Sequence, residues 1–213
     1  MRLALLATVC TACLAAATAS GAATFHASIS RIGPEMKARM VGVSWHRGCP
    51  VPIRRLRVLR VSRWGYDGDV HRGTLIVHRR HARKLRRVMH VLFDKGFRIR
   101  RMRPVDAYGG SDRRSMNANN TSAFNCRYVS GTTRWSQHAY GKAVDVNPIQ
   151  NPWVSNGIAS PKAGQSYVDR TRHHRGMIHA GDKVVRAFAS VGWGWGGYWS
   201  GPKDYMHFSA TGT

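Results

Sequence analysis

Four polar side chains near the end of the chain have the types and spacing that hold and use a metal ion. His138 and Asp145 lie in one stretch, His207 lies in a second, and Asp204 precedes His207 by three positions. A catalytic zinc ion takes three protein ligands from His, Asp, Glu and Cys and keeps a further position for water. His138, Asp145 and His207 therefore predict a site for one Zn²⁺ per chain. The single glutamate, Glu35, is not part of a His-Glu-x-x-His motif, which excludes the peptidases that depend on that motif.

The chemistry predicted for such a site is the hydrolysis of an amide bond. Zinc lowers the pKa of a water ligand from about 15.7 towards about 7. Asp204 is expected to act as the general base that takes a proton from this water and delivers it to the leaving amine. Residues three apart on a regular strand point to opposite faces, so Asp204 and His207 can share a cleft only if the chain turns near Asp204-Tyr205. The preceding Gly201-Pro202 favours such a turn.

The elements that must position these residues are predicted from hydrophobic periodicity. Strands are expected at 56–61, 73–77, 97–100, 142–146 and 206–208, helices at 78–95 and 182–190, and a long loop at 106–135. Strands and helices without regular alternation predict an α+β fold with a mostly antiparallel central sheet flanked by helices. His78, His81 and His90 are expected to face solvent among the arginines of the first helix.

The first residues read as a targeting segment. Residues 1–19 combine one basic residue, an apolar run and a small-residue end, which is typical of a secretory signal peptide. A retained membrane anchor is the alternative, although the run is short and rich in Ala and Thr. Residues 20–45 lack strong periodicity and are interpreted as an N-terminal arm, followed by one domain at 46–213.

Two cysteines remain after such a leader. An exported chain with Cys49 and Cys126 as its only cysteines suggests one disulfide. Two free buried thiols, or thiolate ligands to zinc, are the alternatives.

The formal net charge of +24 indicates polyanionic surroundings. Intracellular chains of this charge usually bind nucleic acid. For an exported chain, anionic cell-wall polymers or lipid headgroups are the better candidates. Arginines that only solvate the surface are the alternative.

The two metal-ligand stretches carry a resemblance to a known family. Five fixed positions form the pattern Ser136-x-His138-x-x-Gly141-x-Ala143-x-Asp145, and Asp204-x-x-His207 follows. This arrangement resembles the zinc D-alanyl-D-alanine carboxypeptidase family, which also includes L-alanyl-D-glutamate endopeptidases, and most of all its VanY-like branch. The family shares a fold group with lysostaphin-type peptidases and the hedgehog domain, and the resemblance covers about residues 45–209.

The resemblance implies roles for several residues. It implies His138, Asp145 and His207 as zinc ligands and Asp204 as the general base. Gly141 and Ala143 are expected to permit a close backbone approach or tight packing.

The family also uses an arginine before the first motif to bind the substrate. It often follows a tyrosine, but here Tyr108 is followed by Gly109, so the role is assigned to Arg127, with Arg113 and Arg114 behind it.

Two further side chains are candidates for substrate binding. Ser136 is expected to bond the substrate or a metal-site group, or else to cap a loop. Trp195, with Trp193, Tyr198 and Trp199, is expected to wall the cleft or else to pack in the core.

These expectations combine into a secreted, cell-wall-associated zinc metallopeptidase that cleaves amide bonds in peptidoglycan stem peptides, with D,D-carboxypeptidase activity favoured. A monomer is expected, with peptidoglycan peptides as substrate, anionic wall polymers as further partners, and no specific nucleic acid. The alternatives are a non-catalytic wall-binding module of the same fold and a secreted basic nuclease. A non-catalytic module has no need for an acidic residue at Asp204.

Overall fold

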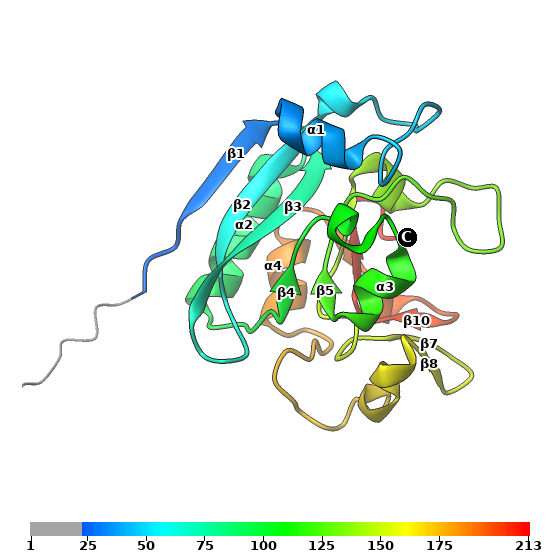
Figure 1. Cartoon of the computed structure of the whole chain (residues 1–213). Coiled ribbons are helices and arrows are strands. Elements are labelled where there is room, and N and C mark those ends of the chain that lie inside the picture. Colours follow the sequence, from blue (N-terminus) through cyan, green and yellow to red (C-terminus); the bar gives the residue numbers. More distant parts are fainter. Residues whose placement is uncertain (1–22) are drawn as a thin grey trace, which may run out of the picture.

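A computed structural model describes residues 23–213 of the chain (Figure 1). The predicted signal peptide at 1–19 lies outside the described residues. Within 23–213, no helix combines the length and the apolar character needed to cross a membrane.

The N-terminal part forms a three-stranded antiparallel sheet in the order β1-β2-β3. Its strands are β1 (Ala27–Arg31), β2 (Leu56–Trp64) and β3 (Val70–His78), and they lie side by side in Figure 1. Helix α1 (Pro34–Met40) follows β1 and buries Met36 and Met40. Part of the segment expected to be an arm is thus paired and packed onto the domain.

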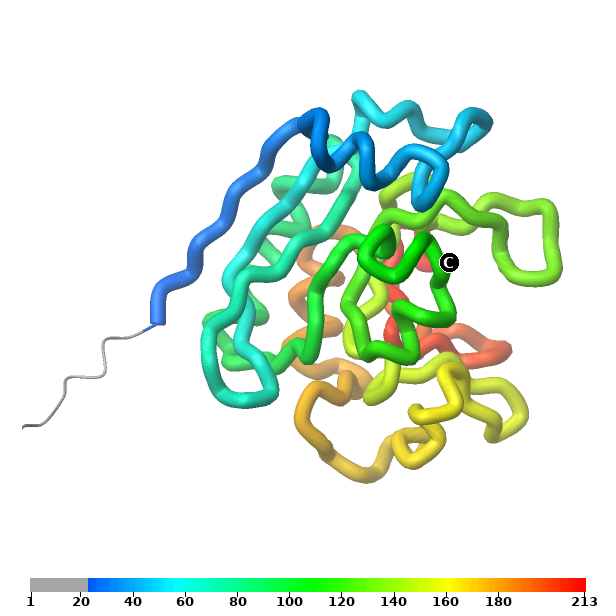
Figure 2. Tube along the Cα trace, viewed as in Figure 1, coloured from blue at the N-terminus to red at the C-terminus, as the bar shows by residue number. Residues whose placement is uncertain are grey.

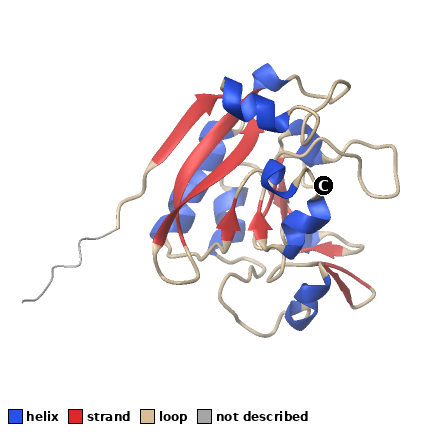
Figure 3. Ribbon diagram, viewed as in Figure 1, coloured by secondary structure: helices blue, strands red, loops and turns tan. Residues whose placement is uncertain are grey.

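Strand β2 contributes to two hydrophobic clusters because successive side chains of a strand point to opposite faces. Leu59 and Val61 join the larger cluster, which helix α2 (Ala82–Asp94) covers, whereas Leu56 and Val58 face the smaller one beneath α1. Figure 3 shows α2 against one face of this sheet.

The helix expected at 78–95 corresponds to α2, which begins only at Ala82. This later start changes the surroundings of the histidines expected on it. His78 ends β3 and is 7% exposed, and His81 precedes the first residue of α2. The expectation that both face solvent is therefore wrong for His78, because the strand continues to this position. His90 is exposed as expected.

The remaining elements are short. The strands are β4 (Arg101–Met102), β5 (Asn120–Thr121), β6 (Ala143–Asp145), β7 (Trp153–Ser155), β8 (Ile158–Ser160), β9 (Gly194–Trp195), β10 (Lys203–Asp204) and β11 (His207–Ser209). The helices are α3 (Asp112–Asn117) and α4 (Lys183–Ala189). Short 3-10 helices are η1 (Ile53–Arg55), η2 (Val105–Tyr108), η3 (Gln137–Tyr140), η4 (Lys162–Tyr167) and η5 (Gly196–Tyr198).

The predicted α+β class is confirmed, with the pairing divided among several small sheets. β6-β11-β9 and β10-β7-β8 are antiparallel, and β4-β5 is a parallel pair. Figure 2 shows the blue-to-cyan N-terminal sheet on one side and most yellow-to-red segments beside and below it. The larger cluster joins these parts, with Phe188 of α4 stacked on Phe208 of β11 at a ring-centroid distance of 3.9 Å.

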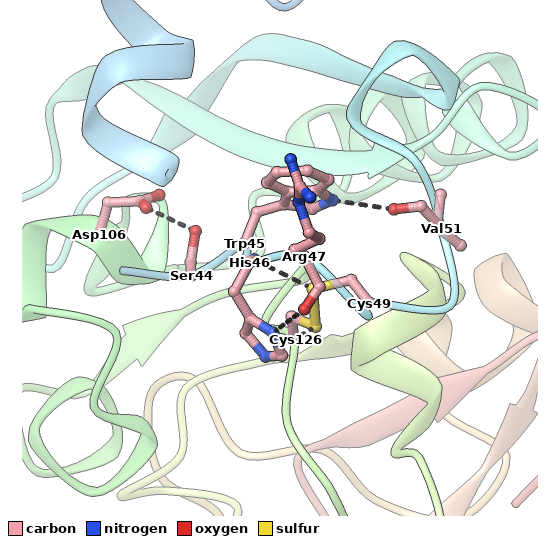
Figure 4. The surroundings of a disulfide bond; sticks show 8 residues. All are labelled: Ser44, Trp45, His46, Arg47, Cys49, Val51, Asp106 and Cys126. Atoms are coloured by element: carbon pink, nitrogen blue, oxygen red, sulfur yellow. Dashed lines mark hydrogen bonds between the residues drawn. A yellow bond between two sulfur atoms is a disulfide. The ribbon is translucent and has the colours of Figure 1, made fainter. Parts of the chain in front are cut away.

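A disulfide links the segment before β2 to the segment after β5, as predicted. Cys49 and Cys126 are bonded with their Cα atoms 5.9 Å apart (Figure 4). The backbone N–H of Cys126 also donates to Ser44 O at 2.9 Å, and the Ser44 hydroxyl donates to Asp106 at 2.5 Å. The bond therefore fixes the segment that enters the candidate site immediately after Cys126.

Candidate metal and catalytic site

Two of the expected metal ligands face each other across one strand pair. β6 and β11 are antiparallel, and Asp145 lies directly opposite His207 in their register. Opposed residues of an antiparallel pair hold their side chains on the same face at close range. Asp145 and His207 are 5% and 7% exposed, so both functional groups are held inside the protein.

The third expected ligand, His138, lies on the tight turn η3. The Ser136 hydroxyl caps this turn by accepting the backbone N–H of His138 at 3.2 Å. Gly141 ends the turn with φ +63°, and a Cβ at this position would lie 2.7 Å from the backbone nitrogen of His78. The predicted close approach at Gly141 is confirmed, because only glycine fits both this conformation and this space.

The three side chains converge on one point. His138 Nε2 lies 3.1 Å from Asp145 Oδ2 and 3.3 Å from His207 Nδ1, and His207 Nδ1 lies 3.1 Å from Asp145 Oδ1. Two ligand atoms of a tetrahedral zinc ion with bonds of about 2.0–2.1 Å are roughly 3.3–3.4 Å apart. The distance between the two imidazole nitrogens, and the distance from each of them to its nearer Asp145 oxygen, therefore fit such an ion with little rearrangement.

Hydrogen bonding fixes which nitrogen of His138 faces this point. His138 Nδ1 lies 2.5 Å from Ala123 O, so Nδ1 carries the proton and donates it to the carbonyl. The lone pair of Nε2 is then directed to Asp145 and His207. A backbone carbonyl that orients a ligating imidazole in this way is a common feature of metal sites.

The electrostatics of this buried cluster also suit a cation. Burial alone would raise the pKa of Asp145, but His138 and His207 outweigh it and hold the pKa far below its usual range. Burial would likewise lower the pKa of His138, and the charge of Asp145 reverses this and raises it. The cluster thus contains a carboxylate that favours a positive charge beside it, and His207 Nε2 is buried with no hydrogen-bond partner among residues 23–213.

Asp204 reaches the same cleft through the turn that the sequence requires. β10 ends at Asp204, Tyr205 and Met206 turn, and β11 begins at His207. Asp204 Oδ1 is buried and has no hydrogen-bond partner within the described chain. Burial, with the negative charges of Asp145 and Asp112, raises the pKa of Asp204 to about 7, while His207 and Arg127 act in the opposite direction.

A cavity of about 700 Å³ contains these groups. The residues around it that bear on the chemistry are Asp112, Arg127, Arg134, Ser136, His138, Tyr140, Asp145, Trp153, Trp199, Asp204 and His207. A cavity of this size accommodates a small peptide or a comparable ligand.

Trp195 is placed differently from the expectation. It is 5% exposed, packs in the larger cluster and donates its indole N–H to Tyr205 O at 2.8 Å. Trp199 lines the cavity instead, and its ring centroid lies 5.6 Å from that of His207. The substrate-binding role expected for Trp195 is therefore corrected to the alternative of core packing, because β9 directs Trp195 into the core, whereas Trp199 of the same group lines the cavity.

Arg127 lines the cavity but is engaged by a carboxylate. Its guanidinium pairs with Asp112 at 2.7 Å. Asp112 begins α3, a helix that was expected to be loop although Ser111 provides a capping residue in the sequence. Sequence reasoning also missed Arg134, a second cation at the cavity, whereas Arg113 and Arg114 are not among the described residues lining it.

Comparison with known proteins agrees with this geometry. Residues 130–210 match the model of the D-alanyl-D-alanine carboxypeptidase family. No curated protein and no solved structure matches the chain.

The matched segment supports a peptidase of this broad family. It contains the whole candidate metal cluster and Asp204, whereas Arg127, Asp112 and the disulfide precede it. The resemblance in sequence pattern and the convergence of the side chains in space therefore concern the same residues.

Proposed function

We propose that this protein is a secreted zinc peptidase that hydrolyses amide bonds in peptidoglycan stem peptides, with D,D-carboxypeptidase activity favoured. The observation that carries the proposal is the convergence of three ligand atoms in one cavity with an unpartnered carboxylate. His138, Asp145 and His207 supply the ligands, and Asp204 supplies the carboxylate.

The chain's own residues divide the work as follows. His138, Asp145 and His207 would hold the zinc ion, which when bound supplies a Lewis acid and an acidic water. Asp204 accepts a proton at its free carboxylate oxygen and later releases it to the leaving amine. A base with a pKa near 7 both takes up and releases protons readily at neutral pH.

Two arginines are suited to bind the carboxylate of a stem peptide. Arg127 and Arg134 both line the cavity. Asp112 orients the Arg127 guanidinium through their ion pair, which leaves Arg134 as a cation without a carboxylate partner among residues 23–213. Ser136 lies at the same wall, where its hydroxyl already holds the turn that carries His138.

The setting of the enzyme is inferred from other features. The disulfide suits an oxidising compartment, in keeping with export by residues 1–19. The net charge of +24 would retain a monomeric enzyme near anionic wall polymers.

Asp204→Asn tests the assignment most directly, because it removes the base and leaves the three ligands. We expect the variant to keep one zinc ion per chain and to lose about 10²–10⁴-fold in turnover. Asp94→Asn, which alters an exposed carboxylate on α2, is the matched control and should keep wild-type turnover.

The measurement is mass spectrometry of purified muropeptides after digestion, with metal analysis of each protein. Loss of one terminal alanine indicates a carboxypeptidase, and a split stem indicates an endopeptidase. Wild-type protein that binds no zinc at micromolar concentration and cleaves no muropeptide would contradict the proposal. A fully active Asp204→Asn variant would instead remove Asp204 from the mechanism.

A further inference from the structure

A second cavity, of about 450 Å³, lies next to the turn that carries His138. Tyr140, in that turn, lines both cavities. The cationic and imidazole side chains around the second cavity are Arg55, His78, Arg79, Arg80, His81, Lys84 and Lys142. None of its described lining residues is acidic, so we refer to it as the basic cavity.

Backbone contacts bring these residues together from three parts of the chain. The N–H of Arg79 donates to Arg55 O at 2.8 Å, which joins the end of β3 to the start of β2. The N–H of His78 donates to Gly141 O at 3.0 Å, which brings Lys142 alongside. The cations are therefore gathered by the fold itself and are not spread along a mobile loop.

The N-terminus of α2 opens beside this cavity. This helix has 13 residues, no side chain caps it at His81, and its first turn holds no acidic residue. The first N–H groups of a helix lack intrahelical partners and carry a partial positive charge. Such an end, without a cap, adds hydrogen-bond donors to the charge already present.

His78 adds an independent sign of a ligand. Its side chain is 7% exposed, and its Nδ1 accepts the backbone N–H of Arg80 at 3.3 Å. The neutral ring must then carry its proton on Nε2, and this donor has no hydrogen-bond partner among residues 23–213. His81 Nδ1 also has no partner in that range, and this atom is buried.

The electrostatic effect of the surrounding cations is visible on the same ring. Burial, followed by the charges of His81, Lys142, Arg80 and Arg79, lowers the pKa of His78 to about 4. His78 is thus a neutral donor at pH 7, inside a cluster of positive charges that no described carboxylate offsets.

We propose that the basic cavity is a binding site for a phosphate group. Guanidinium forks, a lysine ammonium, a neutral imidazole N–H and helix N–H groups approach from several directions, which suits a tetrahedral anion with several acceptor oxygens. A planar carboxylate has fewer acceptor positions and a single charge, so it would leave more of these donors unused. The site is separate from the peptidase chemistry and does not depend on it.

Isothermal titration calorimetry at pH 7 and constant ionic strength tests this proposal. The probes are inorganic phosphate, dimethyl phosphate as a diester, and acetate as a carboxylate. We expect saturable binding of a phosphate probe at one site and at least tenfold weaker binding of acetate. The tighter of the two phosphate probes distinguishes a free phosphate from a diester within a polymer.

Two matched triple variants distinguish binding at the basic cavity from a general effect of the positive charge of the protein. Arg55, Arg79 and Arg80 are exposed at the basic cavity, and their joint replacement by Gln should weaken phosphate binding at least tenfold. Arg83, Arg86 and Arg87 are exposed on α2 outside the cavity, and their joint replacement by Gln should leave the Kd within about threefold. Equal melting temperatures would show that both variants fold.

A His138→Gln background keeps the result independent of the metal, since phosphate could otherwise bind zinc. Binding that survives in this background and is lost in the Arg55/Arg79/Arg80 variant supports the basic cavity. Equal weakening by both triple variants, acetate binding as tight as phosphate, or no saturable binding would overturn the proposal. None of these outcomes bears on peptide hydrolysis.

Discussion

The two cavities on either side of Tyr140 have opposite electrostatic characters. We refer to the cavity of about 700 Å³ as the metal cavity, because it contains the candidate metal ligands. It gathers Asp112, Asp145 and Asp204, whereas the described lining of the basic cavity contains no carboxylate. The chain has only 10 acidic residues against 34 lysines and arginines, so three carboxylates in one cavity are a strong concentration. The comparison teaches that a net charge of +24 conceals a local concentration of negative charge at the candidate metal ligands.

The arginines of the two cavities also differ in whether they form ion pairs. Arg127 in the metal cavity is paired with Asp112 at 2.7 Å. Arg55, Arg79 and Arg80 have no ion pair within residues 23–213. A paired guanidinium is held in place and its charge is partly neutralised, whereas an unpaired one attracts an anion. The first arrangement suits the proposed orientation of a substrate group, and the second suits the proposed capture of a phosphate group.

The largest effect should come from removing one metal ligand. In His138→Gln, we expect zinc to be lost and turnover to fall at least about 10³-fold, because the carboxylate and one imidazole alone hold zinc weakly. Metal analysis and muropeptide digestion measure both quantities. His173→Gln, at an exposed position, should change neither.

The same variant, His138→Gln, also tests whether the two cavities bind their ligands independently. Its affinity for phosphate should stay within about threefold of wild type, because His138 does not line the basic cavity. A His138→Gln protein with normal zinc content would show that the ion is held elsewhere.

A smaller effect is expected from Gly141, which ends the turn that carries Tyr140, the residue lining both cavities. Gly141→Ala places a Cβ 2.7 Å from the backbone nitrogen of His78 at φ +63°, so both the conformation and the space oppose it. We expect the free energy of unfolding, measured by urea denaturation, to fall by about 2–4 kcal/mol. Because the turn carries His138 and borders Lys142, turnover and phosphate binding should fall together.

Gly201→Ala is the matched control for this change. Gly201 has no atom within 4 Å of its Cβ position and lacks a positive φ, so its stability should change by less than about 0.5 kcal/mol. A Gly141→Ala protein of wild-type stability would mean that the turn can move away from His78, and that the two cavities are not rigidly joined.

The sequence predicted which side chains converge in the candidate metal site, because their spacing reflects local structure. Ser136 and Gly141 bracket one tight turn, and the fixed distance from His138 to Asp145 spans that turn and one short strand. The turn before His207 was likewise predictable, because a straight strand could not direct Asp204 and His207 into one cleft. These are short-range constraints, which a single sequence records well.

The features of the site that the sequence could not predict depend on contacts between distant segments. Asp112 meets Arg127 because the start of α3 and the segment after Cys126 border the same cavity. Trp195 and Trp199 lie close in sequence and have equal chemistry, and the pairing of β9 with β11 decides which one enters the core. His78 was expected on an exposed helix, but the apolar periodicity begins only at Ala82, the first residue of α2, and β3 continues to His78.

The smallest predicted effect concerns acid stability and His78. In the folded protein, burial and then the neighbouring cations lower the pKa of His78 to about 4, from about 6.5 in the unfolded chain. Folding therefore favours the neutral ring. The stability contributed by this group is complete above pH 6.5 and is lost progressively as the pH falls from 6.5 to 4. The full shift corresponds to roughly 3 kcal/mol, and solvent screening at the cavity mouth reduces the expected loss to about 1–2 kcal/mol.

The measurement is the free energy of unfolding in urea between pH 7.5 and pH 4, for wild type and His78→Gln. Other groups, the Asp145–His138 pair among them, also titrate in acid, so only the difference between the two proteins reports on His78. That difference should shrink or reverse as the pH falls, because Gln cannot take up the proton that the cations around it oppose. Parallel curves for the two proteins would mean that the cations lie too far from His78 to affect it, and the contrast between the cavities would then be weaker than their lining residues suggest.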